Sequence, residues 1–394
     1  MAPRAMKILM QQGAYFPWIG GAEIFMQKLA EYLVAKGNQV DIVTGIWRKP
    51  DLYTENWNKE FEVINGVNVY RVKTAKVKNI DVMACIWRMI WKTIQLDRTH
   101  NYDIIHSHIF PAMVCGAATK RDKKLLVTLQ GGDIGEYKES NLIIRMLEMP
   151  FITWSLRKAD LVHTVSTHIA NAARKFGAEK VCVVPNGVDT RIFLPQDRSQ
   201  MRKKLGYRLD EKIIVSSSRL TPKNGLDYLI RAVANVPGLK LIIIGDGEQR
   251  KSLESLINTL KLGDRVSLLG YLEHSKLPDY LSAADAFCRP SINEGFGISF
   301  IESMACRIPT IGTRVGGITD IIINGKNGLL VPPKDVGTLT GAIRKVIQDK
   351  NFGRVIAEQG LKTVKEKFTW GVVLKQMANV YEEIMGVNRD GDGQ

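Results

Sequence analysis

The chain has 394 residues, of which 45% are hydrophobic and 24% are charged, a balance that excludes a disordered or fibrous protein. Its length predicts two or three domains. No apolar run is long enough to span a bilayer, and the basic start is not followed by the apolar core of a signal peptide. The five scattered cysteines lack metal-ligand spacing, so we expect reduced thiols in a cytoplasmic protein.

The formal net charge of +15 is compatible with nucleic acid, an anionic membrane or an anionic small molecule as partner. No helix-turn-helix, zinc-finger or aromatic RNA-binding motif accompanies the charge, which disfavours nucleic acid.

Strand-like and helix-like segments alternate along the chain, which predicts α/β domains with parallel sheets. We expect a buried strand at residues 6–12, a loop to residue 21 and a helix over 22–36. Further strands are expected at 39–45, 103–108, 124–130, 161–166 and 180–186. The same plan restarts at Lys212, so we expect two doubly wound domains with a boundary near residues 195–202. Ligands of such sheets bind beyond the carboxyl ends of the strands.

The segment from Glu294 to Glu302 reads Glu-Gly-Phe-Gly-Ile-Ser-Phe-Ile-Glu and follows a strand-like stretch at 285–291. A glycine turn that opens a helix offers backbone N–H groups and a positive dipole end to phosphate or sugar hydroxyls. Along a helix, the two carboxylates would lie ~12 Å apart. A glycosidase pair is separated by only ~5–9.5 Å, so the spacing favours two contacts on one extended ligand.

This segment resembles the Glu-x7-Glu motif of the family 4 retaining glycosyltransferases, which have the GT-B fold. The resemblance implies two Rossmann-like doubly wound α/β domains that face each other across a cleft. Residues 185–193 resemble the interdomain connection of the family, and residues 368–385 resemble its closing helix. An N-terminal acceptor domain would then span 1–194, completed by a helix at 371–394, and a nucleotide-sugar-binding domain would span 195–370.

Arg219 and Lys223 follow the first strand of the second domain. The resemblance implies that they bind the donor diphosphate. A guanidinium and an ammonium can neutralise a departing diphosphate without a metal ion, so we expect neither metal nor cofactor.

The resemblance also implies that Glu302 binds the donor ribose and that Glu294 lies near the sugar hydroxyls. Further donor-binding positions implied by the family are Gly20, Gly21, Tyr271, Leu272, Phe296, Gly297 and Ile298. The turn at 245–248 matches a recurrent family turn, for which we expect a structural role.

His108 ends a strand-like segment, and the family has a histidine at the matching place, close to the transferred sugar. We therefore add His108 to Arg219, Lys223 and Glu294 as catalytic residues. His106 lies on the same face of the strand and is expected to be structural. Residues 128–133 resemble a family turn in which Gln130 replaces a histidine, and Asp133 is assigned to the acceptor side.

The segment at 82–96 is nearly all apolar but also carries Trp87, Arg88, Trp91 and Lys92. A buried helix explains its aliphatic residues. A membrane interface or a lipid-linked acceptor explains the tryptophans and cations better. Both explanations stay open, and the second would place the protein peripherally at the inner membrane face.

These observations lead to the hypothesis of a retaining hexosyltransferase. It would move a sugar from a UDP- or GDP-sugar to a hydroxyl of a glycan or a lipid-linked acceptor. The enzyme alternatives are a nucleotide-sugar 2-epimerase and a sugar phosphorylase of the same architecture. The non-enzyme alternative is a basic protein that binds a membrane or nucleic acid.

Overall fold

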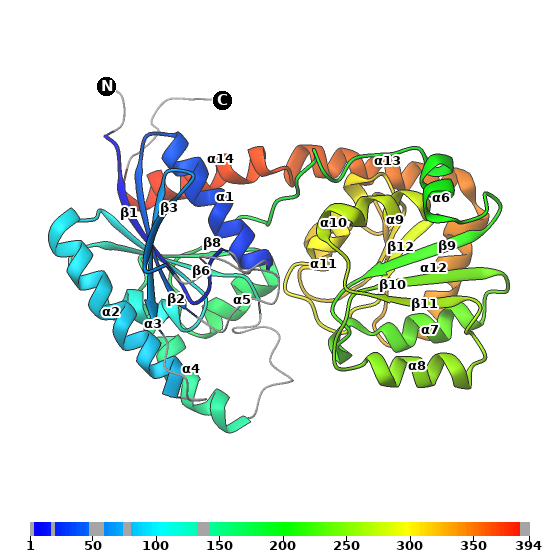
Figure 1. Ribbon diagram of the computed structural model, residues 1–394, viewed down its shortest axis with the longest axis horizontal. Helices are drawn as coiled ribbons and strands as arrows, with labels where there is room; N and C mark the ends of the chain where they lie inside the picture. Colours follow the sequence, from blue (N-terminus) through cyan, green and yellow to red (C-terminus); the bar gives the residue numbers. More distant parts are fainter. Residues whose placement is uncertain (1–3, 17–19, 47–58, 74–79, 132–141, 387–394) are drawn as a thin grey trace. The chain divides into compact units, whose positions relative to one another are not determined.

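The computed structural model describes residues 4–16, 20–46, 59–73, 80–131 and 142–386 (Figure 1). The chain forms two compact domains. Residues 1–186 and 373–394 make the first domain, and residues 187–372 make the second. Both domains are layered α/β units with mainly parallel sheets, which confirms the predicted fold class.

The first domain is built on a sheet with the strand order β3-β4-β2-β1-β5-β6-β7-β8. Its strands are β1 (Lys7–Gln12), β2 (Gln39–Ile46), β3 (Phe61–Ile64), β4 (Val67–Lys73), β5 (Ile104–His108), β6 (Lys124–Leu129), β7 (Leu161–Thr164) and β8 (Val181–Val183). Neighbouring strands are parallel except β3, which pairs antiparallel with β4. The chain runs outward from β1 to β2 and β4, then returns to β5 on the other side of β1. The switch point of this sheet therefore lies between β1 and β5, where ligands of doubly wound sheets bind.

Helices cover both faces of this sheet. They are α1 (Gly21–Ala35), α2 (Ile80–His100), α3 (Ala112–Thr119), α4 (Leu142–Lys158), α5 (Thr167–Lys175) and α14 (Trp370–Ile384). Successive β5 side chains point to opposite faces. Ser107 faces α3, whose Gly116 leaves room for the hydroxyl, whereas His106 contacts Tyr381 of α14. On the α3 side, α2 packs on β2 and β4 and α4 packs on α3.

The second domain has the strand order β11-β10-β9-β12-β13-β14, and all of its pairs are parallel. The strands are β9 (Lys212–Ser217), β10 (Leu239–Ile244), β11 (Val266–Gly270), β12 (Ala286–Arg289), β13 (Thr310–Thr313) and β14 (Leu329–Val331). The helices are α6 (Arg198–Leu205), α7 (Leu226–Ala234), α8 (Arg250–Thr259), α9 (Leu277–Ala283), α10 (Ile298–Ala305), α11 (Ile318–Ile321), α12 (Val336–Gln348) and α13 (Lys350–Lys367), with short 3-10 turns η1 (Pro222–Asn224) and η2 (His274–Lys276). The strands are added outward from β9 to β11, and the chain then returns to β12 on the other side of β9. The second switch point therefore lies between β9 and β12.

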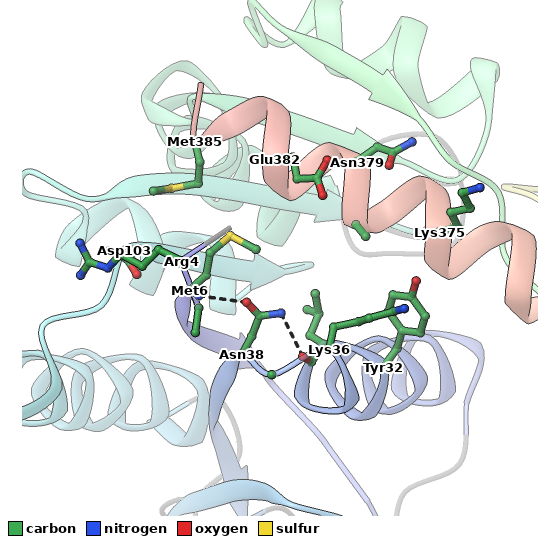
Figure 2. Close-up of a pocket in the computed structure, with 14 residues that line it drawn as sticks. Arg4, Met6, Tyr32, Lys36, Asn38, Asp103, Lys375, Asn379, Glu382 and Met385 are labelled. Carbon is green, nitrogen blue, oxygen red and sulfur yellow. Dashed lines mark hydrogen bonds between the residues drawn. The ribbon is translucent and has the colours of Figure 1, made fainter. Parts of the chain in front are cut away.

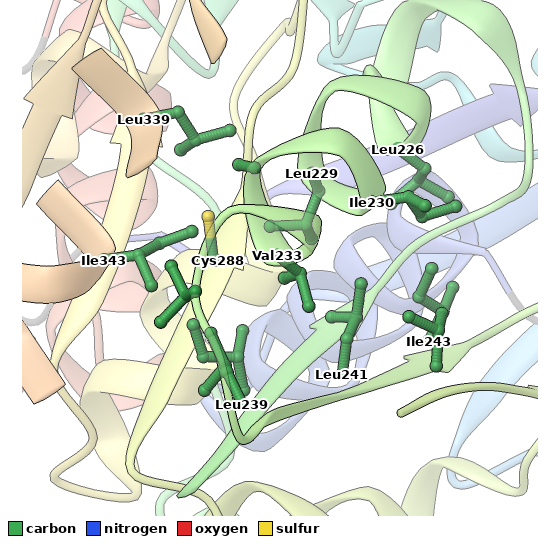
Figure 3. Packing of buried hydrophobic residues seen from close by; sticks show 14 of the residues in the cluster. Leu226, Leu229, Ile230, Val233, Leu239, Leu241, Ile243, Cys288, Leu339 and Ile343 are labelled. Carbon is green, nitrogen blue, oxygen red and sulfur yellow. The ribbon is translucent and has the colours of Figure 1, made fainter. Parts of the chain in front are cut away.

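An aliphatic core under this sheet holds the second switch point in place (Figure 3). The helical spacing of Leu226, Leu229, Ile230 and Val233 places these residues on one face of α7. They meet alternate residues of β10 and the α12 residues Leu339 and Ile343. Each fully buried side chain of this size contributes about 1.5–3 kcal/mol. The core therefore fixes the ends of the strands from which the switch-point loops start.

Candidate functional site

Two loops of the second domain are bonded to each other at the switch point. The loop after β9 carries Lys223, whose carbonyl oxygen accepts a hydrogen bond from the N–H of Ile292 at 2.6 Å, on the loop after β12. Gly225 has a φ of 63°, and a Cβ at this position would collide with the carbonyl oxygen of Pro290. The loop of Lys223 and the loop that leads to Glu294 are thus held side by side.

The turn after β10 supports the same arrangement. The N–H of Ser218 donates to the Ile244 carbonyl at 3.0 Å, and the N–H of Leu220 donates to the Asp246 carbonyl at 3.0 Å. A Cβ on Gly245 would collide with the Ser218 carbonyl. The turn at 245–248 therefore has a structural role: it sets the course of the loop that carries Arg219. The Arg219 side chain is exposed and that of Lys223 is half-buried.

Hydroxyl groups without a partner gather around this switch point. Five serines in the described residues have a buried Oγ atom without a hydrogen-bond partner. One of them, Ser282, lies in α9, and the other four lie at this switch point. These four are Ser216 near the end of β9, Ser218 just after β9, Ser291 after β12 and Ser299 in the first turn of α10. Buried polar groups are normally satisfied, so their concentration at one sheet edge is typical of a functional site. The sequence run of serines at 216–218 was a signal for this edge that our sequence analysis missed.

The side chain of Glu294 has a basic partner. Its Oε2 forms an ion pair with the guanidinium of Arg289, and both side chains are largely buried. The Arg289 guanidinium also lies 4.8 Å from the centre of the Phe300 ring. Arg289 thus neutralises Glu294 and fixes its direction, a partner that the sequence analysis did not identify.

Glu302 lies in α10 and is only 5% exposed. Its Oε1 accepts a hydrogen bond from Nε2 of His274 in η2 at 2.6 Å, and this bond raises the pKa of His274. The two residues are 28 positions apart, so no local pattern connects them. The sequence analysis missed His274 for that reason.

The other predicted donor positions also follow the carboxyl ends of the strands of this sheet. Gly297, with a φ of 101°, is the N-cap of α10, and Ile298 is its first residue. Phe296 is buried against Phe368, with ring centroids 6.0 Å apart. Tyr271 is exposed and Leu272 is half-buried after β11. Of these side chains, that of Phe296 is therefore used for packing.

In the first domain, His108 ends β5 beside Gln12 of β1 and Thr128 of β6. It is completely buried, and neither of its ring nitrogens has a hydrogen-bond partner in the described residues. The amide nitrogen of Gln130 is also without a partner there. Burial, with a smaller effect from His163, lowers the pKa of His108 to about 3, so the ring is neutral.

His106, by contrast, is a satisfied core residue, as the sequence predicts. Its Nδ1 lies 2.5 Å from the Tyr381 hydroxyl and its Nε2 lies 2.6 Å from Oγ1 of Thr128. Gly20 and Gly21 open α1 near the same sheet edge, and a Cβ on Gly20 would meet the Glu23 carboxylate. Asp133 lies outside the described residues.

The two tryptophans of α2 are on the surface. Trp87 is 67% exposed and Trp91 is 60% exposed, while Cys85 and Met89 of the same helix face the core. Arg88 is exposed, and the ammonium of Lys92 lies 5.0 Å from the centre of the Tyr70 ring. One face of α2 therefore packs in the core, whereas both tryptophans lie on its exposed face. No helix in the described ranges is both long and apolar enough to cross a bilayer.

A pocket of about 900 Å³ lies at the opposite, amino edge of the first sheet (Figure 2). It is lined by residues before β1, at the end of α1 and on α14, among them Tyr32, Lys36, Lys375 and Glu382. The switch-point loops follow the carboxyl ends of the strands, so this pocket at the amino ends is separate from the candidate site.

Comparisons with known proteins cover most of the chain. The family model described as Glycosyltransferase Family 4 matches residues 19–192, and the model described as Glycosyl transferases group 1 matches residues 197–363. The uncharacterized glycosyltransferase MJ1607 of Methanocaldococcus jannaschii is 30% identical over 97% of this chain and 100% of its own length.

Two further proteins are similar over nearly the whole chain. The N-acetyl-alpha-D-glucosaminyl L-malate synthase of Bacillus anthracis is 26% identical over 95% of this chain and 97% of its own length. The structure of Anabaena Alr3699/HepE in complex with UDP-glucose has a TM-score of 0.76 and 24% identity, and the match covers 96% of this chain and 100% of that one. The chain thus belongs to the family 4 glycosyltransferases, enzymes with the GT-B fold.

Proposed function

We propose that this glycosyltransferase takes a hexose from a UDP- or GDP-sugar and transfers it, with retention of configuration, to an acceptor hydroxyl. The observation that carries the proposal is the pair of bonded loops at the second switch point. They bring the cations Arg219 and Lys223 onto the same sheet edge as Glu294 and the start of α10. That HepE has been solved with UDP-glucose supports a nucleotide-sugar donor for a chain of the same fold.

The donor diphosphate would bind to Arg219 and Lys223. Negative charge on the diphosphate grows as its bond to the sugar breaks, and two cations placed beforehand stabilise that charge. The N-terminus of α10 adds backbone N–H groups and the positive end of a helix dipole. With this cationic pair in place, the transfer would need no divalent metal.

The rest of the donor would extend along the same edge. Glu302 would accept hydrogen bonds from the ribose, and the backbone at Tyr271 and Leu272 would meet the base. Glu294, held by Arg289, would accept hydrogen bonds from hydroxyls of the sugar. The unsatisfied serine hydroxyls at the same edge are further groups that can bond to a phosphate or sugar.

The properties of His108 support retention. An efficient general base has a pKa near the working pH, whereas the pKa of His108 is about 3. A neutral buried imidazole is suited to hydrogen bonding with a sugar hydroxyl and poorly suited to deprotonating an acceptor. The departing phosphate would instead take the acceptor proton on the face that it leaves, so the new bond forms on that face.

For the acceptor, we propose a hydroxyl of a glycan or of a lipid-linked molecule, reached at an anionic membrane surface. The exposed Trp87 and Trp91 beside Arg88 and Lys92 support this proposal, because such a mixture suits the headgroup region of a bilayer.

A thermal-shift screen tests the donor. UDP-N-acetylglucosamine comes first, because the name of the Bacillus anthracis relative specifies an N-acetylglucosaminyl group, followed by UDP-glucose and GDP-mannose. A donor at a hundred times its Kd should stabilise the protein by about 2.7 kcal/mol. If no UDP- or GDP-sugar raises the melting temperature, the proposed donor class is wrong.

Product analysis then tests the reaction. An α-linked donor should give an α-linked glycoside, which NMR of the first-formed product detects. A β-linked product would contradict retention and leave the transferase intact. Conversion of the nucleotide sugar to its 2-epimer without an acceptor would instead indicate an epimerase.

A further inference from the structure

His274 has two contacts that fix its ring beside Glu302. Its Nε2 donates to Oε1 of Glu302 at 2.6 Å, and its ring lies 4.8 Å from the centre of the Phe193 ring. Phe193 is 1% exposed, so the imidazole packs against a buried aromatic ring. One side chain from η2 thereby holds a carboxylate that belongs to α10.

Glu302 depends on this bond for its direction. The carboxylate is nearly buried, and in the described residues His274 Nε2 is the one side-chain atom that forms an ion pair with it. A carboxylate has two oxygens with about four acceptor sites. His274 uses one acceptor site of Oε1, so Oε2 is the oxygen that keeps both of its acceptor sites for other donors.

From this geometry we infer that His274 is a positioning residue, which holds Glu302 so that Oε2 meets the ribose hydroxyls of the donor nucleotide. The inference rests on the proposed function, in which Glu302 binds the ribose. His274 would act through Glu302 and would not touch the reacting atoms.

The electrostatics of the turn agree with this role. The hydrogen bond to Glu302 raises the pKa of His274, against the opposite effect of burial, so a charge-assisted bond is favoured in the fold. The neighbouring charges of the turn, Glu273 and Lys276, pair with each other at 3.4 Å. They therefore offer a control that lies in the same turn and outside the Glu302 contact.

The test measures UDP and GDP binding by calorimetry with the full chain. His274→Ala should weaken binding of the preferred nucleotide about tenfold, the loss expected for one hydrogen bond to a charged group. His274→Gln keeps an N–H donor and should bind within about threefold of the wild type. Lys276→Ala, in the same turn, should bind like the wild type.

A double-mutant cycle shows whether His274 acts through Glu302. In a Glu302→Ala background, the further change His274→Ala should have no effect on nucleotide binding, because coupled residues are not additive. A purely structural role would give the same loss in both backgrounds and would overturn the inference. Melting temperatures of all variants are measured alongside, and if His274→Ala lowers stability, the binding of His274→Gln decides.

The outcomes separate the inference from the proposed function. If the wild type binds UDP or GDP and His274→Ala binds equally well, the inference is wrong and the proposed donor class stands. If His274→Gln binds as weakly as His274→Ala, the inference is also wrong. If the wild type binds neither nucleotide, both are wrong.

Discussion

Glu294 and Glu302, the two glutamates of the motif, each have a basic partner. Arg289 pairs with Glu294, and His274 donates to Glu302. Removing the basic partner of a largely buried carboxylate leaves that charge uncompensated, so each partner supports its carboxylate. The cations Arg219 and Lys223 differ from them, since Arg219 is exposed on its loop and Lys223 is half-buried.

We expect Arg219→Ala and Lys223→Ala each to lower kcat/KM severely. Each change removes a charge that stabilises the departing diphosphate, and a preorganised group of this kind contributes about 2.7–4 kcal/mol to the transition state. Steady-state kinetics with the donor found in the screen measures the loss. Lys350→Ala, an exposed cation in α13, is the control and should leave kcat/KM unchanged. Near-wild-type kinetics in both site variants would contradict the proposed diphosphate site.

At the scale of elements, glycines decide how closely the switch-point loops approach. Gly225 combines a left-handed φ with a close contact to the Pro290 carbonyl. Gly206 also has a left-handed φ, of 75°, but has open space around it. Gly263 has neither feature. Substitutions at these three positions therefore distinguish the cost of a left-handed backbone from the cost of a collision with a neighbouring loop.

Alanine at these three positions should have graded effects. Gly263→Ala should be neutral. Gly206→Ala should cost about 1–2 kcal/mol of stability, the cost of the left-handed conformation for a residue with a Cβ. Gly225→Ala should cost more and should also lower kcat/KM, because it separates the loops of Lys223 and Glu294. Denaturant unfolding measures the stabilities, and equal kinetics for Gly225→Ala and Gly206→Ala would contradict the role of the loop contact.

The cations and exposed tryptophans of α2 predict binding to an anionic membrane. Wild-type protein should bind anionic vesicles, more weakly as salt rises, because each cation near such a surface contributes about 1 kcal/mol. The double change Arg88→Glu and Lys92→Glu should reduce binding and leave donor binding intact. The matched control is Lys350→Glu with Arg354→Glu on α13 of the second domain. Co-sedimentation measures binding. If the wild-type protein does not bind vesicles at low salt, the proposed membrane surface on α2 is wrong.

At the scale of the whole molecule, stability should depend on the buried histidines of the first domain. Burial lowers the pKa of His163 to about 4 and that of His108 to about 3, and it lowers the pKa of His106 well below its usual range. These rings are neutral in the fold and have a pKa of about 6.5 when unfolded. The unfolded chain therefore binds more protons below that pH, so acid destabilises the fold.

The melting temperature should fall as the pH is lowered from about 6.5 towards 4, since the unfolded histidines take up protons over this range. His163→Gln removes one of these groups and can keep the hydrogen bonds to Thr128 and the Val184 carbonyl. The variant should show a shallower fall than the wild type, measured by thermal unfolding over a pH series. An equal slope in both proteins would mean that His163 does not contribute.

Local patterns in the sequence predicted much of this protein. The alternation of strands and helices, the glycine turn before α10 and the placement of cations after a buried strand all depend on residues close together in the chain. Periodicity and turn chemistry act over such short distances, so they are readable without a structure. The resemblance to family 4 glycosyltransferases rested on the same local segments, and the comparisons confirmed it.

Long-range packing decided the rest. The sequence patterns did not show that β3 and β4 pair antiparallel, that β9 lies beside β12, or that His274 meets Glu302. They also left open whether Trp87 and Trp91 are buried, and only the structure shows them exposed. Exposure and pairing depend on which elements the strand order brings together, and that order is set by contacts between residues far apart in the chain. The sequence by itself therefore determined the family and the local motifs, while tertiary structure determined the partners of each site residue.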